Sequence, residues 1–514
     1  MSNFPFLLVL LLVPLAGSAL VALIPRDQIR LTKQVTLAFS LVTLAVTVVM
    51  CAAFDPKGAR FQFTQSYTWI RALGANFALG VDGIALVLVA LVAVLTPAVV
   101  LASWHERAPG RRSPRVFFSL LLLLEAFMVG VFSATDVLLF YVLFEAMLVP
   151  MYFLIGGFGG PRRQYAAVKF FLYSLLGGLL MLASVIGLFV VSAANHHGHG
   201  TFEFTQLIGM AMNQNTERLL FLGFFIAFAI KAPLVPFHTW LPDAGAEAPI
   251  GGAAILVGVL DKVGTFGFLR YCLPLFPNAS RYFAPAVLVL SVIGVLYAAM
   301  LAMGQKDMKR LVAYTSVAHF GFIGLGIFAF TSQGGTGAVF YMVNHGLSTG
   351  ALFLVVGLLI ARGQSRQISD YNGVARAAPL LGGAFLIAGL SSLALPGMST
   401  FVSEFLVLVG TFTRHPVYAV LATLGIILAA LYILIMYQRM FHGPVSDKAK
   451  GFRDISAREA WAIAPLLALV LVLGIYPKPV LDVIRPAVNA TLHDVHQSDP
   501  APTAGVTAQP GGSK

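Results

Sequence analysis

The chain has 514 residues, of which 58% are hydrophobic and only 11% are charged, and its mean hydropathy is +0.87. A soluble globular domain has about 25% charged residues, so this composition excludes that class of protein. The net charge of +12 does not indicate nucleic-acid binding, because the basic residues lie in short loops between apolar segments. The two cysteines, Cys51 and Cys272, supply no disulfide framework, metal-ligand spacing or redox-cofactor motif.

Apolar runs of about 20 residues, the length that crosses a bilayer, recur from the N-terminus to about residue 477. The first run lacks the basic start of a signal peptide and is expected to be a membrane helix. The sixth and twelfth runs are long enough to be tilted or broken. We therefore predict an all-α polytopic membrane protein of about fourteen transmembrane helices. The predicted spans are residues 4–24, 34–54, 80–103, 116–133, 137–155, 166–193, 219–240, 249–271, 283–303, 311–330, 338–361, 379–410, 417–440 and 459–476.

The lysines and arginines of the loops predict the orientation of these helices. Odd-numbered loops contain 21 of them, whereas even-numbered loops and the C-terminus contain 10. Loops enriched in lysine and arginine usually stay on the cytoplasmic side of a membrane. We therefore expect a multi-pass protein of a bacterial inner membrane, with both termini on the outer side.

Four charged residues lie inside the predicted spans, where an ionisable group costs about 2.5 kcal/mol or more. They are Glu145, Lys231, Lys262 and Glu404. Such groups usually face a polar interior and line ion paths, although a charge near a helix end can instead extend to the membrane surface. A carboxylate that approaches a buried lysine changes how tightly the lysine holds its proton. The pattern therefore predicts proton relay, with Glu145 and Lys231 as a switchable pair if the fifth and seventh helices adjoin.

Two histidines, His319 and His345, add groups that titrate near neutral pH. A lone histidine in a helix is more often a packed polar residue, but the charged neighbours in several helices favour a relay role here. Glu125 is a weaker relay candidate, with hydrogen bonding to a neighbouring helix as the alternative. Asp136, at the start of the fifth helix, is expected to cap that helix.

Three further histidines, His196, His197 and His199, lie together in a predicted outer loop. Their spacing is compatible with a metal site, but no carboxylate or thiol flanks them. We expect a solvated loop and no bound metal.

The chain also contains a weak internal repeat. Residues 167–174 of the sixth helix align with residues 338–345 of the eleventh. Helix-breaking residues follow the same five-helix spacing, with Pro233 and Pro236 in the seventh helix and Pro396 and Gly397 in the twelfth. Five-helix spacing reverses the orientation across the membrane, and paired broken helices in inverted halves are typical of ion pathways. We therefore predict two inverted five-helix repeats with discontinuous helices 7 and 12.

Three long motifs resemble the antiporter-like membrane subunits of respiratory complex I. They lie at residues 136–152, 231–244 and 307–319, and the resemblance extends from about residue 70 to 480. The family's fold implies fourteen helices, with helices 4–8 and 9–13 as inverted units. The expected organisation is helices 1–3 at residues 1–110, the two repeats at 111–275 and 276–442, helix 14 at 443–486, and a disordered tail at 487–514.

Within this family, a carboxylate such as Glu404 in the twelfth helix is typical of the M-type subunit. The L-type and N-type subunits and the Mrp antiporters usually have lysine there, and the L-type also extends into a long lateral helix. Two positions depart from the family. Gly245 replaces a common histidine, and Asp261 beside Lys262 is unusual.

The resemblance implies a proton-translocating subunit of NADH–quinone oxidoreductase that is part of the enzyme but performs no redox chemistry itself. It implies Glu145 and Lys231 as the coupling pair, Lys262 as central relay and Glu404 as exit-side group, with His319 and His345 between them. No cofactor or metal is expected in this chain. NADH, FMN, iron–sulfur clusters and quinone are expected in partner subunits. The expected neighbours of this chain are L-type and N-type subunits and the lipid bilayer. The alternative is a stand-alone or Mrp-type cation/proton antiporter subunit.

Overall fold

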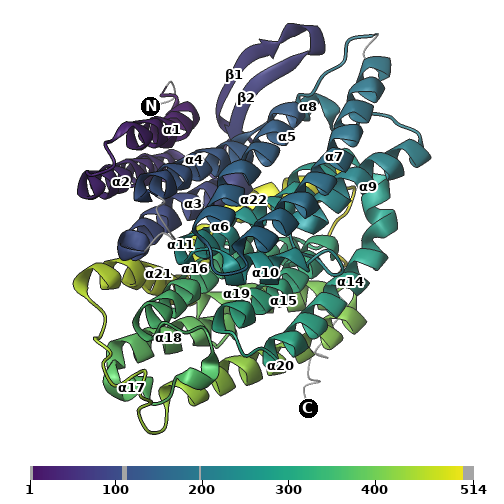
Figure 1. Cartoon of the computed structure of the whole chain (residues 1–514). Helices are drawn as coiled ribbons and strands as arrows, with labels where there is room; N and C mark the ends of the chain where they lie inside the picture. Colours follow the sequence, from purple (N-terminus) through teal and green to yellow (C-terminus); the bar gives the residue numbers. More distant parts are fainter. Residues whose placement is uncertain (1–3, 107–112, 196–197, 502–514) are drawn as a thin grey trace, which may run out of the picture.

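The computed structural model describes residues 4–106, 113–195 and 198–501. Helices form most of the molecule, and a two-stranded hairpin projects from one end of the helical bundle (Figure 1). Twelve helical segments of the described residues are long and apolar enough to cross a bilayer. In chain order they comprise α1 (Phe6–Leu23), α2 (Ile29–Ala53), α3 (Gly83–Ala102), α4 (Pro114–Ser133), α5 (Val137–Ala146) with α6 (Leu148–Phe158), α7 (Arg163–Asn195), α11 to α13 (Ile250–Leu275), α14 (Pro277–Met303), α15 (Met308–Phe328), α16 (Ser332–Gly363), α20 (Pro416–Phe441) and α21 (Ala457–Ile475).

Two further passages are interrupted, and both interruptions lie where the sequence predicts a broken helix. Their halves are α9 (Gln214–Lys231) and α10 (Trp240–Glu247), then α18 (Pro379–Ser392) and α19 (Ser399–Phe412). Pro233 and Pro236 separate the first two, because proline lacks the N–H that a continuing helix needs. Pro396 and Gly397 separate the second two, and Gly397 has a φ of +94°, which glycine adopts without steric cost. Each interrupted pair counted once would give fourteen passages. That count and the inverted repeats remain predictions.

The passage between residues 250 and 275 becomes π-helical twice. Its segments are α11 (Ile250–Ile255), the π-helical η3 (Leu256–Leu260), α12 (Lys262–Gly267), the π-helical η4 (Phe268–Cys272) and α13 (Leu273–Leu275). The passage is buried all round, as expected for a helix whose whole circumference packs against other helices. π-helical turns are rare and occur mostly at functional sites, because they displace backbone carbonyls from the regular hydrogen-bond ladder.

α16 is the helix around which the second half of the chain packs. It contacts α3, α11, α15, α18, α19, α21 and α22 (Lys478–Asp494) and is almost completely buried. By contrast, α2, α20 and α21 are buried over about a third of their residues or less. Apolar faces of this kind suit contact with lipid or with other membrane subunits. Short elements connect the passages: η2 (Ser103–His105), α8 (Phe204–Leu207), η5 (Ile368–Asp370) and α17 (Val374–Ala377).

The all-α expectation is wrong for one segment, the hairpin between α2 and α3. Strands β1 (Gln62–Ile70) and β2 (Ala75–Val81) pair antiparallel, joined by the turn η1 (Arg71–Leu73) and Gly74. Gly74 has a φ of +60°, and a Cβ there would overlap the carbonyl oxygen of Gly200. β1 alternates aromatic and polar residues, a period-2 pattern that a search for long apolar runs does not detect.

The predicted disordered tail begins too early. α22 continues to Asp494, past the boundary set at residue 487, and buries Ile484, Val488 and Leu492 against the bundle. Spacing by four residues places these three side chains on one face of the helix. Asp494 also pairs with Arg60 at 2.7 Å. Residues 502–514 of the predicted tail lie outside the described residues.

We predict that α22 is required for stability. Val488 packs against Gly335 of α16, where a Cβ on the glycine would lie 2.8 Å from the valine Cγ1. Val488→Asp should lower the stability of the protein by at least about 2 kcal/mol, because it buries an unpaired carboxylate. The loss of stability is measured as a lower thermal unfolding midpoint of the protein in detergent-solubilised membranes. Asn489→Asp, exposed on the same helix, is the matched control, and equal midpoints for the two variants would contradict the prediction.

Candidate functional site

The six predicted site residues lie on six different helices, and five of them are almost fully buried. Lys231 (α9) and Lys262 (α12) are 0% exposed, His345 (α16) 1%, His319 (α15) 3% and Glu404 (α19) 4%, whereas Glu145 (α5) is half-buried. Each buried polar group needs a protein or water partner to replace the solvent that it has lost. The contacts of each residue therefore indicate what it can do.

Glu145 and Lys231 lie within electrostatic range of each other on helices that touch. α5 and α9 meet through Phe144 and Phe228, whose ring centroids are 6.0 Å apart. Gly178 of α7 makes space for the carboxylate, because a Cβ there would overlap Glu145 Oε1. Among the described residues, Lys231 Nζ and Glu145 Oε1 have no hydrogen-bond partner and the two side chains form no ion pair within 4.0 Å. The pair is therefore within electrostatic range but open.

Lys231 is also linked to the next lysine through a carboxylate. The charges of Glu145 and Asp261 both act on Lys231, and Asp261 in turn contacts Lys262, with Nζ to Oδ1 at 3.0 Å. Asp261 and Lys262 are both 0% exposed. A fully buried ion pair is costly to form, because both charges lose their hydration.

Lys262 has two further contacts at the end of the π-helical η3. Its ammonium lies 2.7 Å from His345 Nδ1 and donates to the carbonyl oxygen of Val257, five residues earlier. The change in winding frees this carbonyl, since a regular α-helix would hold it in the backbone ladder. Phe320 covers the ammonium, with its ring centroid at 5.3 Å. All the polar contacts of Lys262 are thus made with protein groups.

The polar contacts continue from His345 to the twelfth passage. The rings of His345 and His319 are adjacent, with centroids 5.2 Å apart. His319 Nδ1 lies 2.5 Å from the Tyr341 hydroxyl, which donates to Glu404 Oε2 at 3.2 Å. We call this set the polar row; its members are joined by hydrogen bonds or an ion pair, except His345 and His319, whose rings are adjacent. It comprises Asp261, Lys262, His345, His319, Tyr341 and Glu404.

The donors and acceptors of the polar row fix the positions of several protons. A charged lysine has only donors, so His345 accepts through Nδ1 and its own proton lies on Nε2. The single Tyr341 proton points to Glu404, so the hydroxyl oxygen accepts from His319 Nδ1–H. These tautomers are assigned from the hydrogen-bond network. In this arrangement, His345 Nε2 is left without a partner among the described residues.

Glu404 is positioned by the restart of the interrupted helix. α19 begins at Ser399 and places Glu404 in its second turn. Asn344 of α16 donates to the carbonyl oxygen of Ser399 at 3.0 Å and to the hydroxyl of Ser403 at 2.7 Å. These two bonds attach the start of α19 to the helix that contains Tyr341 and His345.

Sequence reasoning identified four members of the polar row but did not select the other two, Tyr341 and Asp261, as site residues. Tyr341 was not predicted, although it lies four residues before His345 and therefore on the same face of one helix. Asp261 was noted only as an unusual neighbour of Lys262. A tyrosine in an apolar helix is so common as packing that only the contact with Glu404 distinguishes this one.

Other predicted residues lie outside the row. Glu125 is completely buried in α4, and neither of its oxygens has a hydrogen-bond partner among the described residues. No contact therefore supports either a relay role or a hydrogen bond to a neighbouring helix. Asp136 caps α5 by accepting from the amides of Leu138 and Leu139, which confirms that prediction. His199 is exposed, and His196 and His197 lie outside the described residues.

The α10 segment, in which Gly245 departs from the family, is held by ion pairs. Asp243 binds Lys169 of α7 at 2.7 Å and Arg310 of α15 at 2.8 Å. Both basic partners are partly exposed, so each pair contributes little stability, on the order of 1 kcal/mol or less. The pairs fix the position of α10 relative to the two helices.

Known proteins match this chain over nearly its whole length. Residues 134–430 match the model of a protein family described as "NADH:quinone oxidoreductase/Mrp antiporter, TM". NADH-quinone oxidoreductase subunit M of Mycobacterium tuberculosis is 49% identical, covering 98% of this chain and 97% of its own. The subunit M of Rhodobacter capsulatus is 39% identical, with 94% of this chain and 95% of its own covered.

Solved structures agree with these matches. A chain of respiratory complex I from Thermus thermophilus superposes with a TM-score of 0.85 at 31% identity, covering 95% of this chain and 99% of its own. A chain of the Mrp complex from Dietzia sp. has a TM-score of 0.80 at 22% identity and covers 94% of this chain and 52% of its own, which is a likeness of fold alone. The chain therefore belongs to the subunit M family of NADH-quinone oxidoreductase, the antiporter-like membrane subunits of respiratory complex I.

Proposed function

We propose that the chain translocates protons in the membrane arm of a respiratory NADH–quinone oxidoreductase. The observation that supports this most directly is the polar row, a connected series of titratable side chains inside apolar helices. In this proposal NADH, FMN, the iron–sulfur clusters and the quinone are bound by partner subunits, and L-type and N-type subunits are its neighbours in the membrane. This chain supplies the proton path.

Proton transfer along the row proceeds through the contacts already described. Lys262 passes a proton to His345 Nδ1 across 2.7 Å and is reprotonated from the side of Asp261. His345 releases its Nε2 proton toward the adjacent ring of His319. Tyr341 then accepts a proton from His319 while it gives its own to Glu404, so its hydroxyl is unchanged after the step. Glu404 is the exit-side group.

The open pair of Glu145 and Lys231 is the coupling switch. A counter-charge that moves toward a lysine strengthens its hold on a proton, and withdrawal of the counter-charge weakens it. Lys231 lies within electrostatic range of both Glu145 and Asp261. A change in the position or charge of Glu145 therefore alters the balance at Asp261 and, through it, at Lys262. This electrostatic step couples the half-buried glutamate to the buried row.

The distribution of basic residues supports an orientation. With 21 lysines and arginines in odd-numbered loops against 10 elsewhere outside the spans, both termini lie on the outer side of a bacterial inner membrane.

The first prediction concerns Glu145. In inverted membrane vesicles, Glu145→Gln should lower NADH-driven proton pumping and quinone reduction at least about tenfold, because the amide cannot exchange a proton or supply a counter-charge. NADH oxidation by a soluble artificial acceptor should be unchanged. Glu217→Gln is the matched control, since that buried carboxylate accepts from Asn278 outside the row. Unchanged pumping with Glu145→Gln would refute the coupling role.

The second prediction concerns Asp261. Asp261→Asn removes the carboxylate between the two lysines and should reduce pumping per assembled complex at least about tenfold. Asp82→Asn breaks a different buried ion pair, that with Arg270 at 2.8 Å, and should lower the amount of assembled complex without changing its specific pumping. Equal specific pumping in the wild-type and Asp261→Asn complexes would assign Asp261 a purely structural role and contradict the prediction.

The third prediction concerns Tyr341. Tyr341→Phe keeps the ring but removes the hydroxyl between His319 and Glu404, so pumping should fall about tenfold while the artificial-acceptor reaction persists. Tyr271→Phe removes an equally buried hydroxyl, which donates to the carbonyl oxygen of Ala134, and should leave pumping intact. If the two variants pumped alike, the hydroxyl of Tyr341 would not be part of the path.

A further inference from the structure

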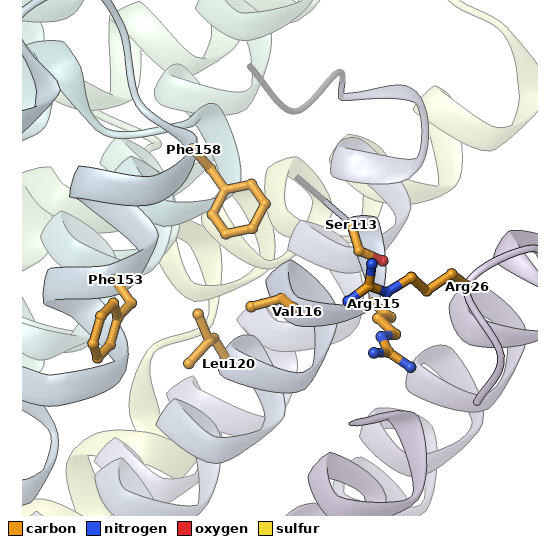
Figure 2. Close-up of a pocket in the computed structure, with 7 residues that line it drawn as sticks. All are labelled: Arg26, Ser113, Arg115, Val116, Leu120, Phe153 and Phe158. Atoms are coloured by element: carbon orange, nitrogen blue, oxygen red, sulfur yellow. The ribbon is translucent and has the colours of Figure 1, made fainter. Parts of the chain in front are cut away.

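A cavity of about 510 Å³ opens at the surface of the bundle, and none of its lining residues belongs to the polar row. It lies between the α1–α2 connection, the start of α4 and the end of α6. Figure 2 shows Arg26 and Arg115 together at one end of the cavity, and Phe153 and Leu120 at the other. The basic end and the apolar end therefore form a single continuous groove.

The two ends lie at different depths along the membrane helices. α4 begins at Pro114, so Arg115 lies in its first turn and Leu120 about 7.5 Å further along the helix axis, at a rise of about 1.5 Å per residue. α6 runs in the opposite direction and ends at Phe158. Phe153 therefore lies about 7.5 Å along the helix axis from that end, a distance similar to that between Arg115 and Leu120. Arg115 thus lies at the end of its helix, and Leu120 and Phe153 lie further from the ends of theirs.

The basic end suits a phosphate group. Two guanidinium groups at one end of a cavity repel each other unless an anion lies between them. Arginine forms paired N–H···O bonds that match the oxygens of a phosphate. Nη1 of Arg115 donates to the carbonyl oxygen of Ile24 at 2.9 Å, which holds the side chain in place while its other N–H groups stay available. Arg115 is therefore preorganised to bind an anion.

The apolar end suits a hydrocarbon chain. Phe153 is 51% exposed and Val116 is 46% exposed, although both lie on membrane-spanning helices. Phe158 and Leu120 complete the wall. An inorganic phosphate would leave these side chains without a packing partner, whereas an acyl chain would lie against them and fill the apolar end of the cavity.

We propose that this cavity binds one anionic phospholipid. Its phosphate lies between Arg26 and Arg115, and one acyl chain lies along Val116, Leu120 and Phe153. Basic pockets at the ends of transmembrane helices recognise acidic headgroups in this way, with about 1 kcal/mol for each arginine near the surface. The site is distinct from the polar row, with which it shares no residue.

The test uses the assembled complex, reconstituted into phosphatidylcholine vesicles that contain a small fraction of a photoactivatable lipid. Phosphatidylglycerol and phosphatidylcholine probes with identical acyl chains are compared, and the labelled peptides are identified by mass spectrometry. Phosphatidylglycerol should label residues 114–120 and 153–158 at least about fivefold more than phosphatidylcholine, as expected for about 1 kcal/mol from one arginine. Equal labelling by the two probes would overturn the proposal.

Variants distinguish the site from general attraction to the membrane. Arg26→Gln and Arg115→Gln should each lower phosphatidylglycerol labelling about fivefold. Because Arg115→Gln also loses the bond to Ile24, Arg26→Gln is the variant that tests headgroup binding without this contact. Arg30→Gln, an exposed arginine beyond the cavity, is the matched control and should leave labelling unchanged. Phosphatidylglycerol labelling that persists in Arg26→Gln would refute the lipid site. Labelling of a neighbouring subunit in place of residues 114–120 and 153–158 would refute it as well.

Discussion

The cost of removing a charge from water determines most of what is distinctive in this fold. Lys262 illustrates it, because a fully buried ammonium in an apolar bundle must find its partners within the protein. It has three: the carboxylate of Asp261, the imidazole of His345 and the carbonyl oxygen of Val257. The last of these is available because the helix switches to π-helical winding just before the lysine. The local irregularity and the charge therefore depend on each other.

The same constraint explains the other irregular features around the polar row. The gap between α18 and α19 lets Glu404 approach α16, where Asn344 holds the restarted helix and Tyr341 supplies the hydrogen bond. The glycine at position 178 gives Glu145 room where any side chain would displace it. In each case a regular, fully packed helix would exclude the charged group. The buried charges of this bundle thus depend on a small number of defined departures from ideal helix geometry.

Much of this architecture could be predicted from the sequence, because membrane helices follow from apolar length alone. The twelve uninterrupted passages and both interruptions lie where apolar runs and the proline and glycine residues indicate. The hairpin β1–β2 and the continuation of α22 could not be found in this way, since both depend on short-period amphipathic patterns. The site residues likewise include some that the sequence reveals and some that it does not. Charges such as Lys231 are conspicuous in an apolar segment, whereas Tyr341 is conspicuous only through its contact with Glu404. The π-helical turn before Lys262 was not predicted, because apolar length and periodicity do not distinguish it from a regular α-helical turn.

The most direct test measures proton uptake and NADH–quinone turnover side by side for the purified complex in proteoliposomes when Lys262 is replaced by methionine. Methionine keeps the length of the side chain but removes the group that touches both Asp261 and His345. The account predicts that proton uptake and quinone reduction fail together, while NADH oxidation by a soluble artificial acceptor continues at the normal rate. Full turnover with an unchanged proton-to-NADH ratio would show that protons do not pass through the polar row.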